Sequence, residues 1–321
     1  MVEERIAGDL PVRSAAAAAA EIPDDATLLV SGFGSVGYPK AVPGALADSG
    51  RDLDLTVVSG GSVGEEIDVA LVEADAIARR YPYQAREPAR AAANDGRIAF
   101  ADRNISTLGD EVRYGGLVDR EGSVAVVEAL AVGEDWLVPT ASLGQTPAFV
   151  ESADALVVEV NRSVPLDLAA LHDVYRPGTP PDRDPIPLTD PGGRIGDERV
   201  AFDPGKLRAV VETEGRDQAY EFRDPTADDR AIAANLRTFL EREVERSALF
   251  EDSLRIQFGV GSLGNALMSA LGEADVGDRD LVYFVEVIQD GLLDLLDEGR
   301  LESASATSLA LSTEGQDRLF E

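Results

Sequence analysis

Short apolar runs that end in glycine, serine or polar turns alternate with amphipathic stretches along the first two thirds of the chain. The runs that predict buried strands are Thr27–Gly32, Leu55–Gly61, Gly96–Asp102, Ser123–Val132, Ala155–Asn161 and Leu207–Thr213. Helices are predicted over Leu10–Ile22, with Asp9 as the N-cap, near Lys40–Asp48, and over Glu65–Ala78. Strands that alternate with helices favour an α/β fold with a largely parallel sheet, whose strand carboxyl ends carry the ligand crevice.

The stretch Tyr175–Arg199 breaks this pattern because it is rich in proline. Proline cannot continue a helix or a central strand, so the stretch is predicted to be an extended excursion or a linker.

The strand, glycine turn and helix pattern returns in the last third of the chain. The predicted elements there are a long helix over Asp229–Arg246, strands over Leu254–Ser262, Leu281–Ile288 and Ser303–Ser312, and helices over Asn265–Leu271 and Gly291–Gly299. We therefore expect two similar open parallel-sheet α/β domains, residues 1–215 and 216–321. The second is expected to be incomplete, because the chain ends soon after its third candidate strand.

Composition narrows the chemistry. The chain has no cysteine, which excludes disulfides, zinc–thiolate sites and a cysteine nucleophile. His172 is the single histidine, so a site with several histidines is impossible and no metal is expected. A lone histidine such as His172 is more often structural than catalytic.

Charge is the strongest compositional signal. The chain has 29 basic and 60 acidic residues, a net charge of −31, and Lys40 and Lys206 are its only lysines. The acids are dispersed rather than gathered in a tail, which indicates a surface adapted to high salt, where charge repulsion is screened. Nucleic-acid binding is disfavoured. No apolar run approaches the roughly 18 residues of a membrane span, and the acidic start lacks a signal core, so a cytoplasmic protein is expected.

Three glycine or arginine motifs could face a ligand. Gly32–Gly37 matches G-x-G-x-x-G, the dinucleotide fingerprint, but the second strand ends without the acid that binds ribose, which disfavours a nicotinamide cofactor. Phe258–Asn265 is a second strand–glycine–helix cradle suited to an anion. Arg79, Arg80 and Arg86 form either an anion-facing edge or surface charge balance.

Glu128, Glu159 and Glu286 each lie within an apolar strand-like run. A buried carboxylate is costly unless it is paired or used, so each is a structural residue with partners, an edge residue that faces water, or a functional group. The local pattern does not choose between them.

Several segments together resemble the acetyl-CoA hydrolase/transferase family, most closely its succinyl-CoA:acetate CoA-transferase type. They include SGFGSVGYPKAVPGALAD, DAIARRYPYQ, PTASLGQTPAFVE, IQFGVGSLGNAL and VEVIQDGLLDLLDEG. The resemblance covers nearly the whole chain in order, and it implies two CoA-transferase domains of the NagB/RpiA-like kind with CoA bound between them.

The resemblance also implies roles for particular residues. Glu286 would be the nucleophile, with Asp290 and Gly291 at the family's offset, although Val285 stands where the family usually has threonine. The residues that would line CoA are Gly261, Ser262, Leu263, Gly264 and Asn265. Those of the acyl pocket would be Gly34, Val36 and Gly37.

The implied activity is transfer of CoA between an acyl-CoA and a small carboxylate such as acetate, through a glutamyl-CoA thioester, or hydrolysis of acetyl-CoA. CoA would be a substrate, with no permanently bound cofactor. Family members continue past the last predicted strand, so a homodimer or a second chain that supplies the missing part is expected. The alternatives are a non-catalytic or partner-dependent subunit and, from another class, a nicotinamide-dependent oxidoreductase.

The net charge of −31 predicts that folding requires salt. Cooperative structure should grow as salt rises from dilute buffer to molar concentration, where the Debye length falls to about 3 Å and carboxylate repulsion is screened. Circular dichroism over a salt series measures this. A fully cooperative fold in dilute buffer would contradict the prediction.

Overall fold

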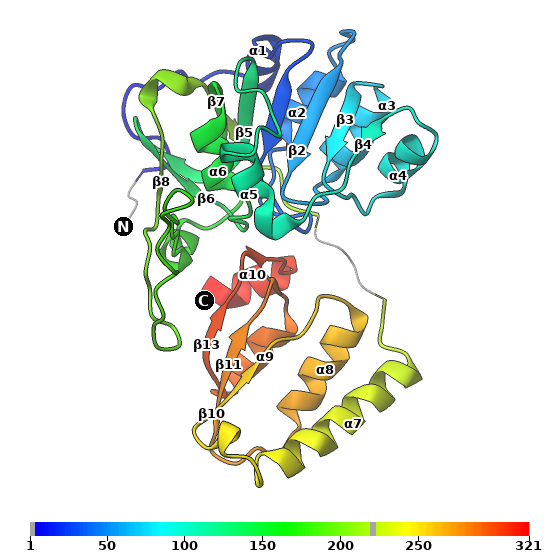
Figure 1. Ribbon diagram of the computed structural model, residues 1–321, viewed down its shortest axis with the longest axis vertical. Coiled ribbons are helices and arrows are strands. Elements are labelled where there is room, and N and C mark those ends of the chain that lie inside the picture. The colour runs from blue at the N-terminus through cyan, green and yellow to red at the C-terminus, as the bar shows by residue number, and fades with distance from the viewer. Residues whose placement is uncertain (1–3, 219–222, 321) are drawn as a thin grey trace. The chain divides into compact units, whose positions relative to one another are not determined.

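The structure is a computed structural model that describes residues 4–218 and 223–320 (Figure 1). The described residues form two compact units. Unit 1 contains residues 4–184 and 196–218, and unit 2 contains residues 185–195 and 223–320. Part of the proline-rich stretch, Pro185–Ile195, therefore belongs to unit 2, although the chain on either side of it belongs to unit 1.

The elements of unit 1, in chain order, are α1 Ala15–Ala20, β1 Thr27–Val30, α2 Ala41–Ala47, β2 Leu55–Ser59, the π-helical turn η1 Glu66–Ala70, α3 Leu71–Glu73, β3 Ile77–Tyr81, α4 Glu87–Asn94, β4 Ala99–Phe100, α5 Ile105–Arg113, β5 Ser123–Val132, β6 Trp136–Pro139, α6 Thr146–Ser152, β7 Ala155–Asn161, the 3-10 helix η2 Leu166–Leu171, β8 Val200–Ala201, η3 Pro204–Lys206 and β9 Leu207–Thr213.

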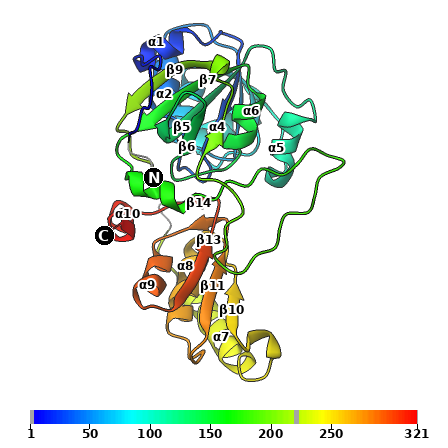
Figure 2. The same ribbon diagram turned by 90° about the vertical axis from the view of Figure 1, so that its left-hand side faces the viewer.

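Unit 1 is built on one sheet, which runs β4-β3-β2-β1-β5-β7-β9 with all neighbours parallel. The second half of β5 pairs instead with β6, and β6 pairs with β8, both antiparallel. Strand residues alternate between two hydrophobic clusters: Leu28 and Val30 join one, and Leu29 joins the other. Burial on both faces explains the continuous apolar runs. Figure 2 shows α1 and α2 on one side of the sheet and α5 and α6 on the other.

The elements of unit 2 are α7 Ala227–Glu243, η4 Ala248–Phe250, β10 Ser253–Ile256, α8 Ser262–Gly272, β11 Asp280–Phe284, β12 Val287–Ile288, α9 Gly291–Asp297, β13 Leu301–Ser305, β14 Ser308–Leu309 and α10 Thr313–Phe320. Its sheet, β10-β11-β13, is parallel, and β12 and β14 form a separate parallel pair. One core cluster joins the sheet to α7, α8 and α9, with Leu254, Leu281 and Tyr283 facing those helices. The predicted α/β fold with parallel sheets is confirmed.

Several predicted elements differ from the structure; the run Ser303–Ser312, for example, is not one strand but parts of β13 and β14, which lie in separate sheets. The first helix begins at Ala15 because Ser14, not Asp9, caps it; residue 12 bridges to Val210 beside β9 instead. The predicted helix over Glu65–Ala78 ends at Glu73, and Ile77 begins β3. The run Leu281–Ile288 is two strands in two sheets, interrupted at Val285 and Glu286.

No helix among the described residues is long and apolar enough to cross a membrane.

The loop that follows β1 is locked against the loop that follows β2 by an aromatic ring and a glycine. Tyr38 is fully buried, and a Cβ at Gly64 would lie 1.7 Å from a carbon of its ring. Only glycine fits there. Gly44 is the opposite case: it lies within α2, and a Cβ there would meet nothing within 4 Å.

These two glycines provide a matched pair. Gly64→Ala should destabilise unit 1 by about 3 kcal/mol, because the ring is held in a packed core and must move. Gly44→Ala should stabilise it by roughly 0.5–1 kcal/mol, because alanine favours a helix. Urea unfolding at constant salt measures both. Equal effects would contradict this account of the loop.

Candidate functional site

The carboxyl edge of the unit 1 sheet contains a topological switch point. From β1 the chain passes through α2 to β2 on one side, and β5 lies on the other side of β1. In open parallel sheets ligands bind where neighbouring connections diverge in this way. The loop that follows β1, with Gly34, Val36 and Gly37, lies at this point.

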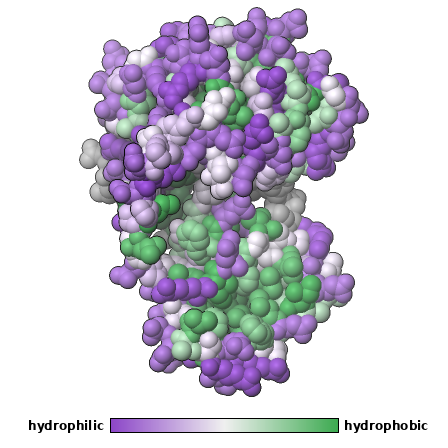
Figure 3. Space-filling model, in the orientation of Figure 1, coloured by the Kyte–Doolittle hydropathy of each residue, from purple (hydrophilic) through white to green (hydrophobic). Residues whose placement is uncertain are grey.

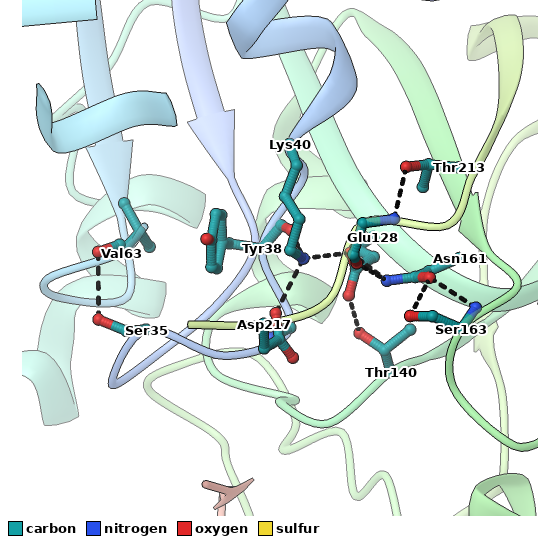
Figure 4. A network of polar contacts seen from close by, with 12 residues as sticks. Ser35, Tyr38, Lys40, Val63, Glu128, Thr140, Asn161, Ser163, Thr213 and Asp217 are labelled. Carbon is teal, nitrogen blue, oxygen red and sulfur yellow. Dashed lines mark hydrogen bonds and ion pairs between the residues drawn. The ribbon is translucent and has the colours of Figure 1, made fainter. Parts of the chain in front are cut away.

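A buried polar cluster fills the switch point, and its members come from separate parts of the chain (Figure 4). We call it the switch-point cluster; its residues are Lys40, Glu128, Thr140, Asn161 and Asp217. The Lys40 ammonium lies 2.6 Å from Glu128 Oε2 and 2.8 Å from Asp217 Oδ1. Thr140 Oγ1 donates to Glu128 Oε1 at 2.7 Å, and Asn161 Nδ2 donates to Glu128 Oε2 at 3.0 Å.

Burial and ion pairing shift the pKa values in this cluster. Burial raises the pKa of Glu128 to about 8, although the Lys40 ammonium opposes the shift. Burial alone would lower the pKa of Lys40, but the Glu128 and Asp217 carboxylates outweigh it and raise that pKa above its ordinary value. Lys40 therefore stays cationic at neutral pH.

Glu159 closes the amino end of α2. Its carboxylate accepts the backbone N–H groups of Lys40, Ala41 and Val42, at 2.8, 3.0 and 2.6 Å. Burial raises its pKa, and the three backbone donors oppose this. The carboxylate takes the position where the pyrophosphate of a dinucleotide would bind, at the helix amino terminus. This arrangement removes the physical basis for a nicotinamide site at Gly32–Gly37.

Two backbone N–H groups of the loop that follows β1 donate hydrogen bonds to other segments of unit 1. Gly37 N–H donates to Asp217 Oδ2 at 3.0 Å, and Ser35 N–H donates to the Ser62 carbonyl. Gly37 has φ +66°, and a Cβ there would lie 2.6 Å from the Ser142 nitrogen. Among the three residues expected to form an acyl pocket, Val36 and Gly37 are buried and Gly34 is partly exposed.

The arginine motif has a structural role at Arg80. Its guanidinium is buried, pairs with Asp68 at 3.0 Å and donates to Ser59 Oγ at 2.8 Å. Arg86 pairs with Glu65 and donates to the Val63 carbonyl. Arg80 is therefore neither an anion-facing residue nor part of a surface charge balance.

The single histidine lies near a backbone acceptor: His172 Nε2 is 2.7 Å from the Pro139 carbonyl oxygen.

In unit 2 the sequence-predicted CoA-binding residues form the start of α8. Gly261 is the N-cap, with φ +131°, and Ser262 begins the helix. A Cβ at Gly264 would lie 2.1 Å from the Gly259 carbonyl oxygen, so the tight turn requires glycine there. Leu263 is exposed and Asn265 is half-buried. The first N–H groups of a helix have no intrahelical acceptor, so this turn offers donors to an anion.

Glu286 lies in the break between β11 and β12, and its side chain is exposed. The predicted continuous strand over Leu281–Ile288 is therefore wrong at this position, and the exposed side chain rules out the alternative of a buried residue with partners. The strand stops at Phe284, and the Glu286 carbonyl accepts Thr307 N–H instead of a sheet partner. Among the described residues, the Glu286 carboxylate has no hydrogen-bond or ion-pair partner.

The structure brings Glu286 and the α8 turn to the same edge of one sheet. β10 and β11 are parallel neighbours; β10 leads into Gly261, and β11 leads into Glu286. Phe258 and Tyr283, which precede these two positions, pack in a tilted arrangement with ring centroids 6.0 Å apart. Asp290 accepts Ser312 N–H and Oγ–H and so holds the turn that follows β12. Gly34, Val36 and Gly37 belong to unit 1.

Sequence reasoning missed Lys40, Asp217 and Asp68 as members of buried ion pairs. The one available signal was rarity, because Lys40 is one of two lysines and lies three residues after the glycine motif. Its partners lie far away along the chain, so no local pattern connects them. No group of acidic or histidine side chains within residues 4–218 and 223–320 is arranged to hold a metal ion.

Comparisons with known proteins agree on one family. The sequence profile of the acetyl-CoA hydrolase/transferase N-terminal domain matches residues 11–212. A succinyl-CoA:acetate CoA-transferase of Clostridium kluyveri is 36% identical over 308 residues, which cover 94% of this chain and 56% of that protein. An acetyl-CoA hydrolase of Yarrowia lipolytica is 36% identical over 304 residues, which cover 91% and 57%.

The fold is also shared with a solved structure. RipA from Yersinia pestis superposes with a TM-score of 0.68 at 17% identity, over 96% of this chain and 66% of that one. The matches to the Clostridium kluyveri and Yarrowia lipolytica proteins cover 56% and 57% of those proteins, so the chain spans just over half of their length.

The raised pKa of Glu128 predicts how stability depends on pH. Between the unfolded value of 4.5 and the folded value of about 8, the folded state holds a proton that the unfolded chain releases. This contribution to stability is present at low pH and is lost as pH rises, with a slope of up to about 1.4 kcal/mol per pH unit. Glu128→Gln should remove that slope in urea titrations from about pH 5 to 8.

Glu121→Gln is the matched control, because Glu121 is exposed just before β5. It should leave the slope unchanged. Identical pH profiles for wild type and Glu128→Gln would show that Glu128 does not hold the extra proton.

Proposed function

Because the chain belongs to the acetyl-CoA hydrolase/transferase family, we propose that it acts on acyl-CoA thioesters, with Glu286 as the nucleophile. It transfers CoA between an acyl-CoA, such as acetyl- or succinyl-CoA, and a small carboxylate such as acetate, or it hydrolyses acetyl-CoA. The relatives from Clostridium kluyveri and Yarrowia lipolytica carry those two activities in their names.

The observation that carries the proposal is the contrast between three glutamates. Glu128 and Glu159 each accept three hydrogen bonds and are fully buried. Glu286 is exposed at the edge where α8 begins, without a partner among the described residues. A nucleophile needs an accessible lone pair, and of the three only Glu286 offers one.

The chemistry balances without a redox step. The Glu286 carboxylate attacks the thioester carbonyl and the C–S bond breaks. The CoA thiolate departs, and an acyl–glutamyl anhydride remains on Glu286. The thiolate then attacks the glutamyl carbonyl, releases the first carboxylate and forms a glutamyl-CoA thioester. An acceptor carboxylate takes CoA by the reverse steps, whereas water gives hydrolysis.

The remaining proposed roles come from the family resemblance, and the geometry of α8 supports one of them. The turn from Gly261 to Asn265 binds CoA through the first N–H groups of α8, which favour an anion. Gly34, Val36 and Gly37 form part of the acyl pocket. The net charge of −31 and the scarcity of lysine support a salt-adapted cytoplasmic enzyme.

A second candidate is a partner-dependent subunit of such an enzyme. Parallel sheets are normally covered on both faces, yet Phe284, on the face of β11 away from the helices, is 69% exposed. Further exposed apolar residues of unit 2 are Ile232, Phe239, Leu249 and Leu263. Figure 3 shows apolar residues gathered on the visible face of unit 2. A second polypeptide or a second copy that covers such surface would complete the active form.

Glu286→Gln tests the proposed function. Wild-type chain incubated with acetyl-CoA in high salt should gain the mass of CoA on a peptide that contains Glu286, and borohydride should reduce that thioester to an alcohol. The amide cannot form the anhydride, so Glu286→Gln should lose the adduct and at least about 10³-fold of the transfer rate. Mass spectrometry and a succinate-dependent transfer assay measure these two results.

Glu302→Gln is the control, because Glu302 is an exposed glutamate on β13 of the same unit. It should keep the adduct. The assay is run with and without the C-terminal part of the Clostridium kluyveri relative, so that partner dependence appears as activity in the mixture alone. An adduct on Glu128, or no adduct under either condition, would refute the assignment of Glu286 in this chain.

A further inference from the structure

After β9 the chain crosses the carboxyl edge of the sheet and is bound there before it leaves unit 1. We call residues 214–218 the exit segment. The Gly215 carbonyl accepts Asn161 Nδ2 at 2.7 Å, and Gly215 N–H donates to Thr213 Oγ1 at 3.2 Å. A Cβ at Gly215 would lie 2.9 Å from Lys40 Cδ, so glycine lets the exit segment pass close to the lysine stem.

Asp217 makes the contacts that connect the exit segment to the loop after β1. Its side chain is 5% exposed, with Oδ1 2.8 Å from Lys40 Nζ and Oδ2 3.0 Å from Gly37 N. Figure 4 shows the ammonium between Asp217 and Glu128. A carboxylate is costly to bury, and a core that needed only packing would be better served by an apolar residue.

The hydrogen bond from Gly37 N–H to Asp217 orients a backbone amide that lies outside the strands of the sheet. Gly37 has φ +66°, a conformation that glycine adopts without steric cost, and it lies between β1 and α2. Asp217 thus determines where this amide points. Without it, the Gly37 N–H is released and Lys40 keeps Glu128 as its remaining carboxylate partner in the cluster.

We propose that Asp217 is a positioning residue that holds the Gly34–Gly37 loop, through Gly37 N–H and Lys40, in the conformation that receives the acyl group. The role in acyl binding rests on the proposed function, whereas the holding of the loop does not.

Asp217→Ala and Asp217→Asn separate the hydrogen bond from general packing. Alanine removes both contacts, so the Gly37 amide should exchange with deuterium at least about tenfold faster, while the Leu29 amide in β1 stays within about twofold of wild type. Asparagine keeps an oxygen for Gly37 and should restore slow exchange at that amide. Glu212→Ala, at an exposed ion pair on β9, is the control and should change neither amide.

In the transfer assay, Asp217→Ala should lower kcat/KM for the acceptor carboxylate by about tenfold or more, while the dissociation constant for CoA stays within about twofold of wild type. Asp217→Asn should recover most of that loss. The expected split arises because Asp217 contacts the proposed acyl loop, whereas the proposed CoA turn lies on α8 of unit 2.

The proposal is overturned if Gly37 exchange is unchanged in Asp217→Ala, if Leu29 accelerates equally, or if asparagine gives no rescue. Altered Gly37 exchange with unchanged acceptor kinetics overturns the role in acyl binding. A chain without any CoA adduct on Glu286 refutes the proposed function instead, and the Gly37 exchange still decides whether Asp217 holds the loop.

Discussion

The Lys40 ammonium, buried at the switch point between β1 and β5, is the group on which the arrangement of unit 1 depends. An isolated buried cation is strongly unfavourable, so the Lys40 ammonium needs the two acidic side chains that lie against it, Glu128 and Asp217. Removing one partner of a buried pair typically costs 3–5 kcal/mol, since it leaves an uncompensated charge. Glu128 comes from a central strand and Asp217 from the exit segment. The loop after β1, the middle of the sheet and the end of unit 1 are therefore stabilised together rather than independently.

Sequence periodicity predicts the fold well where strands are buried on both faces. The bounds of β5, β7 and β9 agree with the apolar runs, because continuous burial leaves an unbroken apolar signal. The strand β3 was missed because two of its five residues are arginines, and the burial of Arg80 depends on Asp68, which lies on another element. The break at Val285 was missed for the opposite reason: apolar residues continue through it while the backbone changes sheets.

The candidate site was predictable only in part, because local sequence cannot distinguish a satisfied carboxylate from a free one. Glu128, Glu159 and Glu286 have similar neighbours in the chain, yet Glu128 receives donors from three distant residues and Glu159 receives three helix amides. Their difference from Glu286 arises entirely from tertiary contacts. The choice of Glu286 from sequence depended on a family resemblance, and the turn at Gly261–Asn265 was predictable because strand, glycines and helix are adjacent in the chain.

The proposed chemistry needs a glutamate that is neither saturated with hydrogen bonds from the protein nor hydrated by water. A glutamate that accepts three hydrogen bonds is stabilised as an anion or shares its proton, and either condition weakens it as a nucleophile. Glu286 avoids those contacts, but an exposed carboxylate is hydrated, and hydration also weakens it. Its reactivity must therefore be acquired when the thioester binds and displaces water. The first N–H groups of α8 lie at the same sheet edge, so the group that positions CoA would also bring the thioester to the nucleophile.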